Sequence, residues 1–403
     1  MIDQTYHPRC LEAKIRGRVS RGKVRLLFGA RQTGKSFLLR ALAPPGAIVI
    51  NLQDPRERLR YERTAGTLAG EIEARRDKRV WVCIDEIQKA PALLDEVHRL
   101  IESRRLRFAL SGSSARRLRR TGVNLLGGRA ITRWLAPFVS AELGDRFDLR
   151  RALEWGLLPM VVLDPSQAAD TLAAYVHTYI REEIREEGLV RKIDPFLRFL
   201  QVAGLMNGQE LNVENIARDA GAPRTTVDGY FTILVDTLLG HLLPAYQPGV
   251  KVRERGHPKF YWFDVGVARA AAGLLRDPLD AIWRGTALET LVLHELRVHN
   301  HVRGKERLLA YYRTAAGVEI DFVVETRRRT ASTPPRLVCI EVKAAPRWKR
   351  QWEAPMRALA AAGGVIVERM IGVYAGRDRL HFDAVDVLPV ESFLAALHAG
   401  DVF

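Results

Sequence analysis

The amino-acid sequence predicts an α/β protein whose N-terminal third is built on a mostly parallel β-sheet. Short apolar runs alternate with amphipathic stretches between residue 23 and about residue 143, and a glycine-rich motif follows the first run. Strands that alternate with helices indicate a parallel sheet with helices on both faces. Because 403 residues exceed one compact core, we also expect more than one domain.

Five apolar runs in this region are predicted to form the strands of the sheet. They are Val24–Phe28, Ala47–Asn51, Val80–Ile84, Arg107–Leu110 and Ala130–Leu135. Amphipathic segments between these runs, such as Ala92–Glu102, are predicted helices. The first domain is expected to span residues 1–147.

The rest of the chain is predicted to form three further units. Residues 148–206 combine apolar residues at helical spacing with the charged run REEIREEGLVRK, and we expect them to be helical. Residues 207–278 contain a helix-turn-helix pattern followed by a hairpin. Residues 279–403 begin with a helix and return to mixed α/β structure.

Composition and charge limit the classes of partner. Apolar residues make up 47% and charged residues 27%, which is ordinary for a soluble protein, but the formal net charge is +16. This excess favours a polyanionic partner, DNA or RNA first and an anionic membrane surface second. The alternative is an arginine-rich surface that is simply solvated.

The location is predicted from what the sequence lacks. No stretch approaches about 18 uncharged apolar residues, and the N-terminus has no apolar signal segment, so we expect no membrane span. The three cysteines, Cys10, Cys83 and Cys339, are too scattered for a disulfide framework or a zinc site. A cytoplasmic location is therefore expected.

The segment from Gly29 to Ser36, GARQTGKS, fits the motif G-x-x-x-x-G-K-[ST] between a predicted strand and a predicted helix. In this motif, backbone N–H groups and the helix N-terminus bind nucleotide phosphates. We expect Lys35 to contact the β- and γ-phosphates of ATP and the Ser36 hydroxyl to bind Mg²⁺. The alternative is a glycine turn before a core helix. The predicted nucleotide-binding residues are Gly29, Ala30, Arg31, Gln32, Thr33, Gly34, Lys35, Ser36 and Phe37.

A second motif lies one helix and one strand further along. The apolar run VWVCI ends in Asp85 and Glu86, which is the Walker B pattern. Asp85 is predicted to hold the magnesium shell, and Glu86 is predicted to polarise the attacking water. Binding ATP needs only the first carboxylate, so the second predicts hydrolysis.

Two further residues are candidates near this site. Ser111, at the end of the predicted strand RFAL, could contact the γ-phosphate or the water as a sensor. The alternative is that the serines after this strand only cap a helix. Arg129 could act as an arginine finger within the subunit or across a subunit interface, or it could be an ordinary surface arginine.

The helix-turn-helix pattern predicts a DNA contact. Arg224, Thr225 and Thr226 open its second helix, where base edges or phosphates would be met. The hairpin that follows resembles a basic wing, with Lys251, Arg253 and Arg255 as the predicted contacts. Alternatively, this unit only packs between its neighbours.

A carboxylate pattern marks the C-terminal region. Asp321 lies in one predicted strand, and Glu341 and Lys343 share one face of the next, because side chains alternate along a strand. This D…ExK arrangement suits a metal-dependent phosphodiesterase, in which carboxylates hold Mg²⁺ and the lysine orients water or stabilises charge. The alternatives are a solvent-facing charged strand and a site that binds nucleic acid without cleaving it.

Ten segments together carry a family resemblance: GARQTGKS, VCIDEIQKAP, LSGSSARRLRR, GGRAITRWLAPFVSAEL, WGLLPMVV, YFTILVDTLLGHLLPAY, PKFYWFDVGVA, GTALETLVLHEL, YYRTAAGVEIDFVVE and CIEVK. They resemble a widespread group of prokaryotic AAA+-type ATPases that end in a domain of unknown function. The resemblance implies a P-loop core of the additional-strand type, a helical lid and a winged helix. It also implies a final domain similar to the PD-(D/E)XK nuclease fold, in which Glu289 would be a further metal ligand.

Two functions stay open at this point. One is an ATP-driven protein that acts on nucleic acid through its winged helix and a metal-dependent nuclease-like domain. The other is a non-cleaving nucleotide switch whose winged helix and C-terminal domain bind a protein partner. The sequence permits both a monomer and a homo-oligomer.

Overall fold

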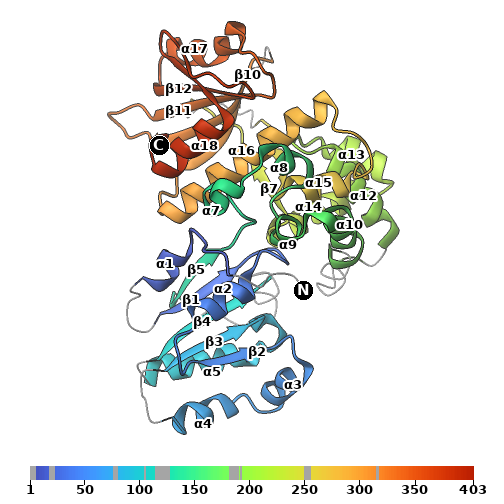
Figure 1. The fold of residues 1–403 in the computed structure, drawn as a ribbon, viewed down its shortest axis with the longest axis vertical. Coiled ribbons are helices and arrows are strands. Elements are labelled where there is room, and N and C mark those ends of the chain that lie inside the picture. Colours follow the sequence, from blue (N-terminus) through green and yellow to red (C-terminus); the bar gives the residue numbers. More distant parts are fainter. Residues whose placement is uncertain are drawn as a thin grey trace.

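The computed structural model describes residues 6–17, 23–75, 80–103, 106–113, 128–180, 190, 193–248, 256–314 and 317–403. One sheet with its helices lies at one end of the long axis, a second sheet lies at the other end, and a helical part lies beside the middle (Figure 1). The long helix α16 (Ala281–Arg303) runs between the helical part and the second sheet. Within the described residues, no helix is long and apolar enough to cross a membrane.

The N-terminal sheet is parallel, with the strand order β2-β3-β4-β1-β5. Strand β4 lies between β1, which precedes the glycine-rich motif, and β3, which ends in the acidic pair. This inserted strand defines the additional-strand type, so the predicted α/β fold class is confirmed. The strands are β1 (Val24–Phe28), β2 (Ile48–Asn51), β3 (Trp81–Asp85), β4 (Arg107–Gly112) and β5 (Ala130–Trp134).

Helices cover both faces of this sheet, as strand–helix alternation predicts. On one face, Leu26 and Ile84 pack with the helices α3, α4 and α5, and on the other Leu27 packs with α1 and α2. The helix boundaries are α1 (Glu12–Arg16), α2 (Lys35–Leu42), α3 (Pro55–Arg63), α4 (Thr67–Glu73), η1 (Ile87–Lys89) and α5 (Ala92–Ser103).

The middle of the chain is helical and then turns into a helix-turn-helix with a small sheet. Its first helices are α7 (Ser140–Leu143), η2 (Gly144–Arg146), α8 (Leu149–Trp155), α9 (Pro159–Leu163), η3 (Pro165–Gln167), α10 (Ala168–Ala174), η4 (Tyr175–Ile180) and α12 (Ile193–Leu205). The later elements are β6 (Gln209–Glu210), α13 (Val213–Ala220), α14 (Arg224–Asp236), β7 (Gly240–Leu243), β8 (Lys259–Trp262) and α15 (Val265–Ala271).

The turn between α13 and α14 follows from local chemistry. Asn212 caps the start of α13 by accepting a hydrogen bond from the Asn215 N–H at 3.1 Å. Gly221 ends the helix in the left-handed conformation that favours glycine. The helical region and the helix-turn-helix share one hydrophobic core, in which Leu172 packs with Phe199 and Phe231.

The C-terminal sheet is mixed, with the order β13-β14-β12-β11-β10-β9. Helices α16 and α18 pack on one face through Leu291 and Leu394, and α17 packs on the other through Met356. The remaining elements are β9 (Leu308–Arg313), β10 (Glu319–Arg327), β11 (Arg336–Lys343), η5 (Arg350–Glu353), α17 (Ala354–Ala361), β12 (Ile366–Tyr374), β13 (Leu380–Phe382), β14 (Val385–Pro389) and α18 (Val390–Ala399).

Candidate functional site

The glycine-rich motif forms a tight loop between β1 and α2. A Cβ atom at Gly29 would lie 2.5 Å from the Leu135 carbonyl oxygen, so only glycine fits there. Gly34 has φ +91, which also favours glycine, and α2 begins at the next residue. The Lys35 ammonium is buried and donates hydrogen bonds of 2.9 Å to the carbonyl oxygens of Gly29 and Ala30. The loop therefore encloses its own lysine, as a phosphate-binding loop requires.

Arg9 supports the loop from outside. Its guanidinium donates to the Thr33 carbonyl at 2.8 Å and to the Ala136 carbonyl at 2.6 Å, and its Nε lies 2.9 Å from Glu142 Oε2. Both side chains of this ion pair are buried. The sequence alone did not indicate this role, because Arg9 lies outside any motif.

The acidic pair lies at the carboxyl end of β3. Asp85 is buried and accepts a hydrogen bond from the Ser111 hydroxyl, which comes from the neighbouring strand β4. Glu86 adopts the left-handed conformation, with φ 59, which is unusual for a residue with a side chain. Such strain occurs where the fold aims a functional side chain, and Glu86 does line the cavity described below.

Gln88 holds the Glu86 carboxylate. The Gln88 amide nitrogen donates to Glu86 Oε2 and to Ser113 Oγ, the latter at 3.0 Å. Its amide oxygen is buried and has no hydrogen-bond partner among the described residues. Gln88 is thus a positioning residue for Glu86 that no motif revealed.

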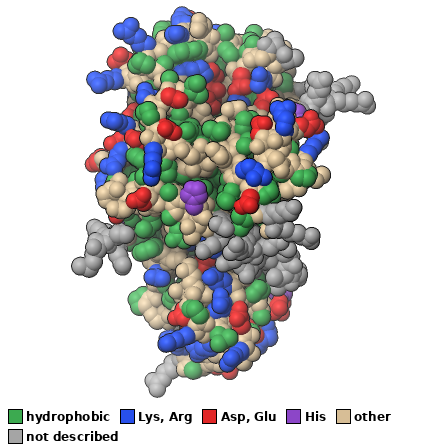
Figure 2. Space-filling model, turned by 90° about the vertical axis from the view of Figure 1, so that its right-hand side faces the viewer, with side chains coloured by type: hydrophobic (Ala, Val, Ile, Leu, Met, Phe, Trp, Pro, Cys, Tyr) green, Lys and Arg blue, Asp and Glu red, His purple; other side chains and the backbone are tan. Residues whose placement is uncertain are grey.

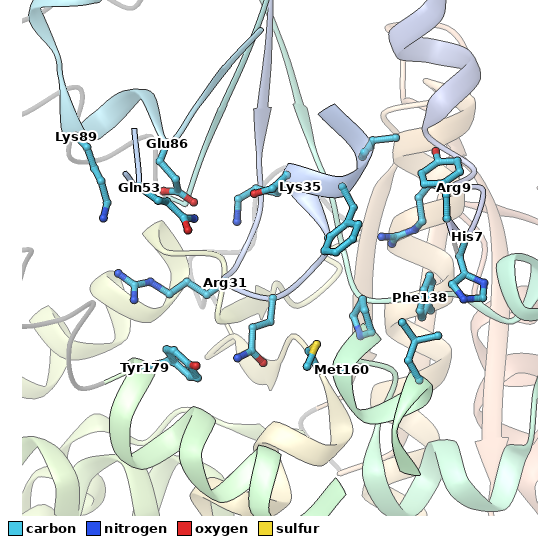
Figure 3. Close-up of a pocket in the computed structure, with 18 residues that line it drawn as sticks. His7, Arg9, Arg31, Lys35, Gln53, Glu86, Lys89, Phe138, Met160 and Tyr179 are labelled. Carbon is cyan, nitrogen blue, oxygen red and sulfur yellow. The ribbon is translucent and has the colours of Figure 1, made fainter. Parts of the chain in front are cut away.

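A cavity of about 430 Å³ lies over the loop, between the N-terminal sheet and the helices α9 and η4. Lys35, Glu86, Gln53 and Lys89 lie along one side of it, while Arg31, Tyr179 and Met160 lie across from them (Figure 3). Among the residues that the motifs predict, Arg31, Gln32, Gly34, Lys35, Ser36, Phe37 and Glu86 line the cavity.

Aromatic and apolar side chains also line the cavity, and His7 and Phe138 lie beside Arg9 at one end of it (Figure 3). The aromatic and apolar lining residues outside the nucleotide-binding motifs are Tyr6, His7, Phe138, Pro159, Met160 and Leu163. They come from the N-terminal segment, the chain after β5 and the helix α9, so only folding brings them together. The Gln32 side-chain oxygen is also buried there without a partner among the described residues, so a donor on a bound ligand would satisfy it.

Arg129 lies at the other end of the sheet from the loop. It directly precedes β5, beside the start of β1, whereas the loop follows the end of β1. Its guanidinium contacts His98 at 3.1 Å and forms an ion pair with Glu102. Five strand residues, roughly 16 Å, separate it from the loop, so the prediction of an arginine finger within the subunit is wrong. A role across a subunit interface stays a prediction.

The helix-turn-helix presents less free positive charge than its sequence suggested. Arg224 forms an ion pair of 2.9 Å with Glu214 and lies 4.0 Å from Asp228. Thr225 and Thr226 follow it in the first turn of α14, where Thr225 is exposed and Thr226 is half-buried. Lys251, Arg253 and Arg255 lie outside the described residues.

The C-terminal strands bring the predicted D…ExK residues into contact. The Lys343 ammonium lies 3.3 Å from Asp321 Oδ2 and 2.5 Å from Glu341 Oε1. Asp321 Oδ2 also accepts the Val342 N–H at 2.7 Å. The lysine therefore sits between the two carboxylates.

Glu289 and the strand β8 complete this centre. The Tyr261 hydroxyl, from β8, donates to Glu289 Oε2 at 3.2 Å, and Lys259 forms an ion pair with Glu319. Burial, and then the nearby Asp321 carboxylate, raise the pKa of Glu289 and of Glu341 to about 8. Across the described ranges, no group of three or more His, Cys, Asp and Glu side chains is arranged to hold a metal ion.

Three family models match successive parts of the chain. Residues 21–144 match an AAA domain. Residues 146–278 match the domain of unknown function DUF8612, and residues 284–393 match the domain of unknown function DUF4143.

Relatives and solved structures were also found. Two uncharacterized proteins, from Mycobacterium bovis and Mycobacterium tuberculosis, are each 25% identical over 394 residues, which cover 95% of this chain and 83% of theirs. The DNA complex of the Aeropyrum pernix ORC1 protein matches at 15% identity and a TM-score of 0.29, covering 66% of this chain and 89% of its own. C. elegans PCH-2 matches at 15% identity and a TM-score of 0.23, and the match covers 45% of this chain and 46% of PCH-2.

The sheet order, the loop around Lys35 and the match over residues 21–144 agree with one another. Residues 21–144 of this chain thus match an AAA domain, and they carry a P-loop on a parallel sheet.

Proposed function

We propose that this chain binds ATP with magnesium in the cavity over the P-loop and hydrolyses it, and that this cycle accompanies binding to nucleic acid. The observation that carries the proposal is the convergence of Lys35, Ser36 and Glu86 on one cavity of about 430 Å³. A triphosphate and its base need both a cationic, amide-lined end and an apolar end, and this cavity offers both.

The phosphates would bind at the loop. Lys35 would exchange its two carbonyl partners for phosphate oxygens, and the N–H groups at the start of α2 would point at the same oxygens. Lys89 adds a cation to this side of the cavity and has no carboxylate partner in the described part of the chain.

The oxygen donors near the loop fit magnesium. Ser36 and Asp85 supply hard oxygen ligands, and Mg²⁺ in such sites keeps few protein ligands beside water and phosphate oxygens. The lack of a three-acid cluster is therefore compatible with this assignment. When bound, the ion would neutralise negative charge on the phosphates.

Glu86 would act on the attacking water. Its carboxylate lines the cavity and would accept a proton from a water placed beside the γ-phosphate. Gln88 restrains that carboxylate through its amide nitrogen, so the reach of Glu86 toward the water depends on Gln88 as well.

For the C-terminal domain, the contacts favour the non-cleaving alternative. Lys343 bridges Asp321 and Glu341, and Tyr261 is hydrogen-bonded to Glu289, so the protein's own side chains already engage the predicted metal ligands. We propose that this centre joins the winged helix to the final sheet. Cleavage of DNA or RNA with Mg²⁺ or Mn²⁺ that is lost in both Asp321→Ala and Lys343→Ala would contradict this proposal.

The decisive experiment measures ATP turnover with and without duplex DNA. We expect turnover that DNA stimulates, and a loss of about 100-fold or more in Glu86→Gln with nucleotide binding retained. Turnover that is unaffected by Glu86→Gln would remove the hydrolytic role of this residue. Turnover that ignores DNA would favour the switch that binds a protein partner.

A further inference from the structure

A second cavity, of about 450 Å³, lies in the C-terminal domain, away from the nucleotide site. Four arginines line it, from the chain before β9, the end of β10, the start of β11 and the middle of β12. Its polar lining consists of Arg307, Thr326, Arg327, Arg336, Glu368 and Arg369.

This cavity is separate from the D…ExK centre. In the sheet, Arg327 pairs with Arg336 at one end of β10, whereas Phe322 pairs with Ile340 near the other end. Five residue steps along β10, roughly 16 Å, separate these pairs, so the arginines and the carboxylates occupy opposite ends of the same strands.

The cavity carries positive charge that the described residues do not neutralise. Arg336 lies 2.8 Å from Glu368, and Arg369 lies 3.3 Å from Asp386. No ion pair within 4.0 Å involves Arg307 or Arg327 in the parts of the chain that the structure describes, although Arg307 is close enough to Glu368 to help lower the pKa of that carboxyl. Four guanidiniums thus face a single carboxylate in the lining, which leaves room for an anion.

Further cations next to Arg307 make the electrostatic potential at the cavity more positive. The pKa of Lys305 is lowered, first by burial and then by the positive charges of Arg307 and Arg303. Arg307 also lies over the Phe403 ring, 5.6 Å from its centroid, which fixes the direction of its guanidinium. A cation whose pKa is lowered by its cationic neighbours marks a place where an anionic ligand would relieve repulsion.

Charge elsewhere in the described part of the chain is more mixed or already paired. The face in Figure 2 mixes Lys and Arg with Asp and Glu, so the net charge of +16 is not concentrated there. In the helix-turn-helix, Arg224 is already paired with Glu214.

We propose that the cavity around Arg307 and Arg327 binds the phosphodiester backbone of a nucleic acid. This inference rests on the proposed nucleic-acid role and names the surface that would perform it. Guanidinium groups bind phosphate oxygens through two parallel hydrogen bonds, and backbone contacts of this kind supply most of the affinity that does not depend on sequence. Guanidinium groups also bind carboxylates, so an acidic protein is the competing partner; the net charge of +16 favours the denser negative charge of a nucleic acid.

The test uses the full chain and a fluorescent duplex of about 20 base pairs, titrated between roughly 50 and 200 mM salt. The double variant Arg307→Gln with Arg327→Gln removes both unpaired cations and keeps part of each side-chain stem. Arg350→Gln is the matched control, because Arg350 is exposed in the same domain but paired with Asp383 at 2.6 Å. Arg224→Gln tests the helix-turn-helix.

We expect the double variant to weaken DNA binding by about 10-fold or more at 100 mM salt and to reduce the salt slope by about 2. Arg350→Gln and Arg224→Gln should leave both quantities near the wild-type values. Thermal unfolding midpoints that match the wild type would show that the double variant is folded.

Four outcomes would overturn the inference. If the double variant binds DNA as tightly as the wild type, this surface is rejected but the nucleic-acid role is kept. The same holds if Arg224→Gln weakens DNA binding as much as the double variant does. Absence of DNA binding by the wild type at low salt would reject the role itself. Equal competition by polyglutamate at matched charge would reassign the cavity to an acidic protein.

Discussion

The molecule contains two charged sites built around a buried or half-buried lysine, and they differ in what that lysine contacts. At the P-loop, Lys35 donates to two backbone carbonyls beside a cavity of about 430 Å³. In the C-terminal centre, Lys343 lies between two carboxylates, and side chains from β8 engage the neighbouring acids.

This difference decides which site can accept a ligand without rearrangement. A lysine that is hydrogen-bonded to carbonyl oxygens can move to phosphate oxygens, since the charge–charge contact that it gains is stronger. Removing a lysine from a buried carboxylate pair leaves uncompensated charge, which costs about 3–5 kcal/mol. The first site is therefore prepared for an anion, and the second is neutralised from within.

The strongest test of this contrast is Lys35→Ala. We expect ATP turnover to fall by about 1,000-fold, because the variant loses a cation that contacts the transferring phosphoryl group. Phosphate release under saturating ATP and magnesium measures the effect. Lys349→Ala, an exposed lysine of the C-terminal domain, is the control and should retain full turnover.

Unchanged turnover in Lys35→Ala would remove the P-loop assignment. A loss of turnover with full nucleotide affinity would instead restrict Lys35 to the chemical step.

Lys343→Met tests the other side of the comparison, through stability and not turnover. The variant keeps the aliphatic stem but leaves Asp321 and Glu341 without their cation, so above pH 8, where Glu341 is ionised in the wild type, we expect the free energy of unfolding to fall by about 3 kcal/mol. Denaturant unfolding of the full chain measures this change, and Lys349→Met should shift it by less than about 0.5 kcal/mol.

A second substitution separates the ion pair from simple packing. Adding Glu341→Gln to Lys343→Met removes one uncompensated charge, so part of the lost stability should return. If the two losses simply add, the contact between Lys343 and Glu341 does not stabilise the fold.

The apolar runs of the sequence predicted the strands of the first sheet well, because whether a segment forms a strand depends mainly on residues close to it in the sequence. The five strands of the first sheet begin and end within two residues of their predicted positions, and the order around β4 matches the predicted class. Apolar runs of this length, bounded by turns, have few alternatives. The packing of the helical region onto the helix-turn-helix was not predictable, since periodicity does not say which faces meet.

The nucleotide site was predictable only where a motif defines it. Lys35, Ser36 and Glu86 lie in short patterns and line one cavity. Arg9 supports the loop through contacts with residues distant in the sequence. Gln88 holds Glu86 from a position that the motif does not specify. Arg129 failed as an arginine finger of its own subunit because it precedes β5, and the start of this parallel strand lies at the edge of the sheet opposite the loop.

The contact between α16 and strand β5 gives the smallest predicted effect, a change in how stability depends on pH. His301, on α16, stacks on Trp134 of β5 with ring centroids 4.6 Å apart, and its Nε2 accepts the Trp134 N–H at 3.2 Å. Burial, and then the charges of Arg133 and Arg297, lower its pKa from 6.5 to about 4.

A lowered histidine pKa means that the unfolded chain binds more protons between pH 6.5 and about 4. The stabilisation is therefore complete above pH 6.5 and is lost as the pH falls through this window, by about 2 kcal/mol between pH 6.5 and pH 5. Unfolding measured by denaturant at pH 7 and pH 5 should show this part of the loss in the wild type.

His301→Gln keeps a hydrogen-bond acceptor but cannot titrate, so its unfolding should depend less on pH. Because His299 has a similarly lowered pKa, some acid sensitivity should persist in the variant. An unchanged pH dependence would mean that His301 does not couple protonation to the contact between the AAA domain and α16.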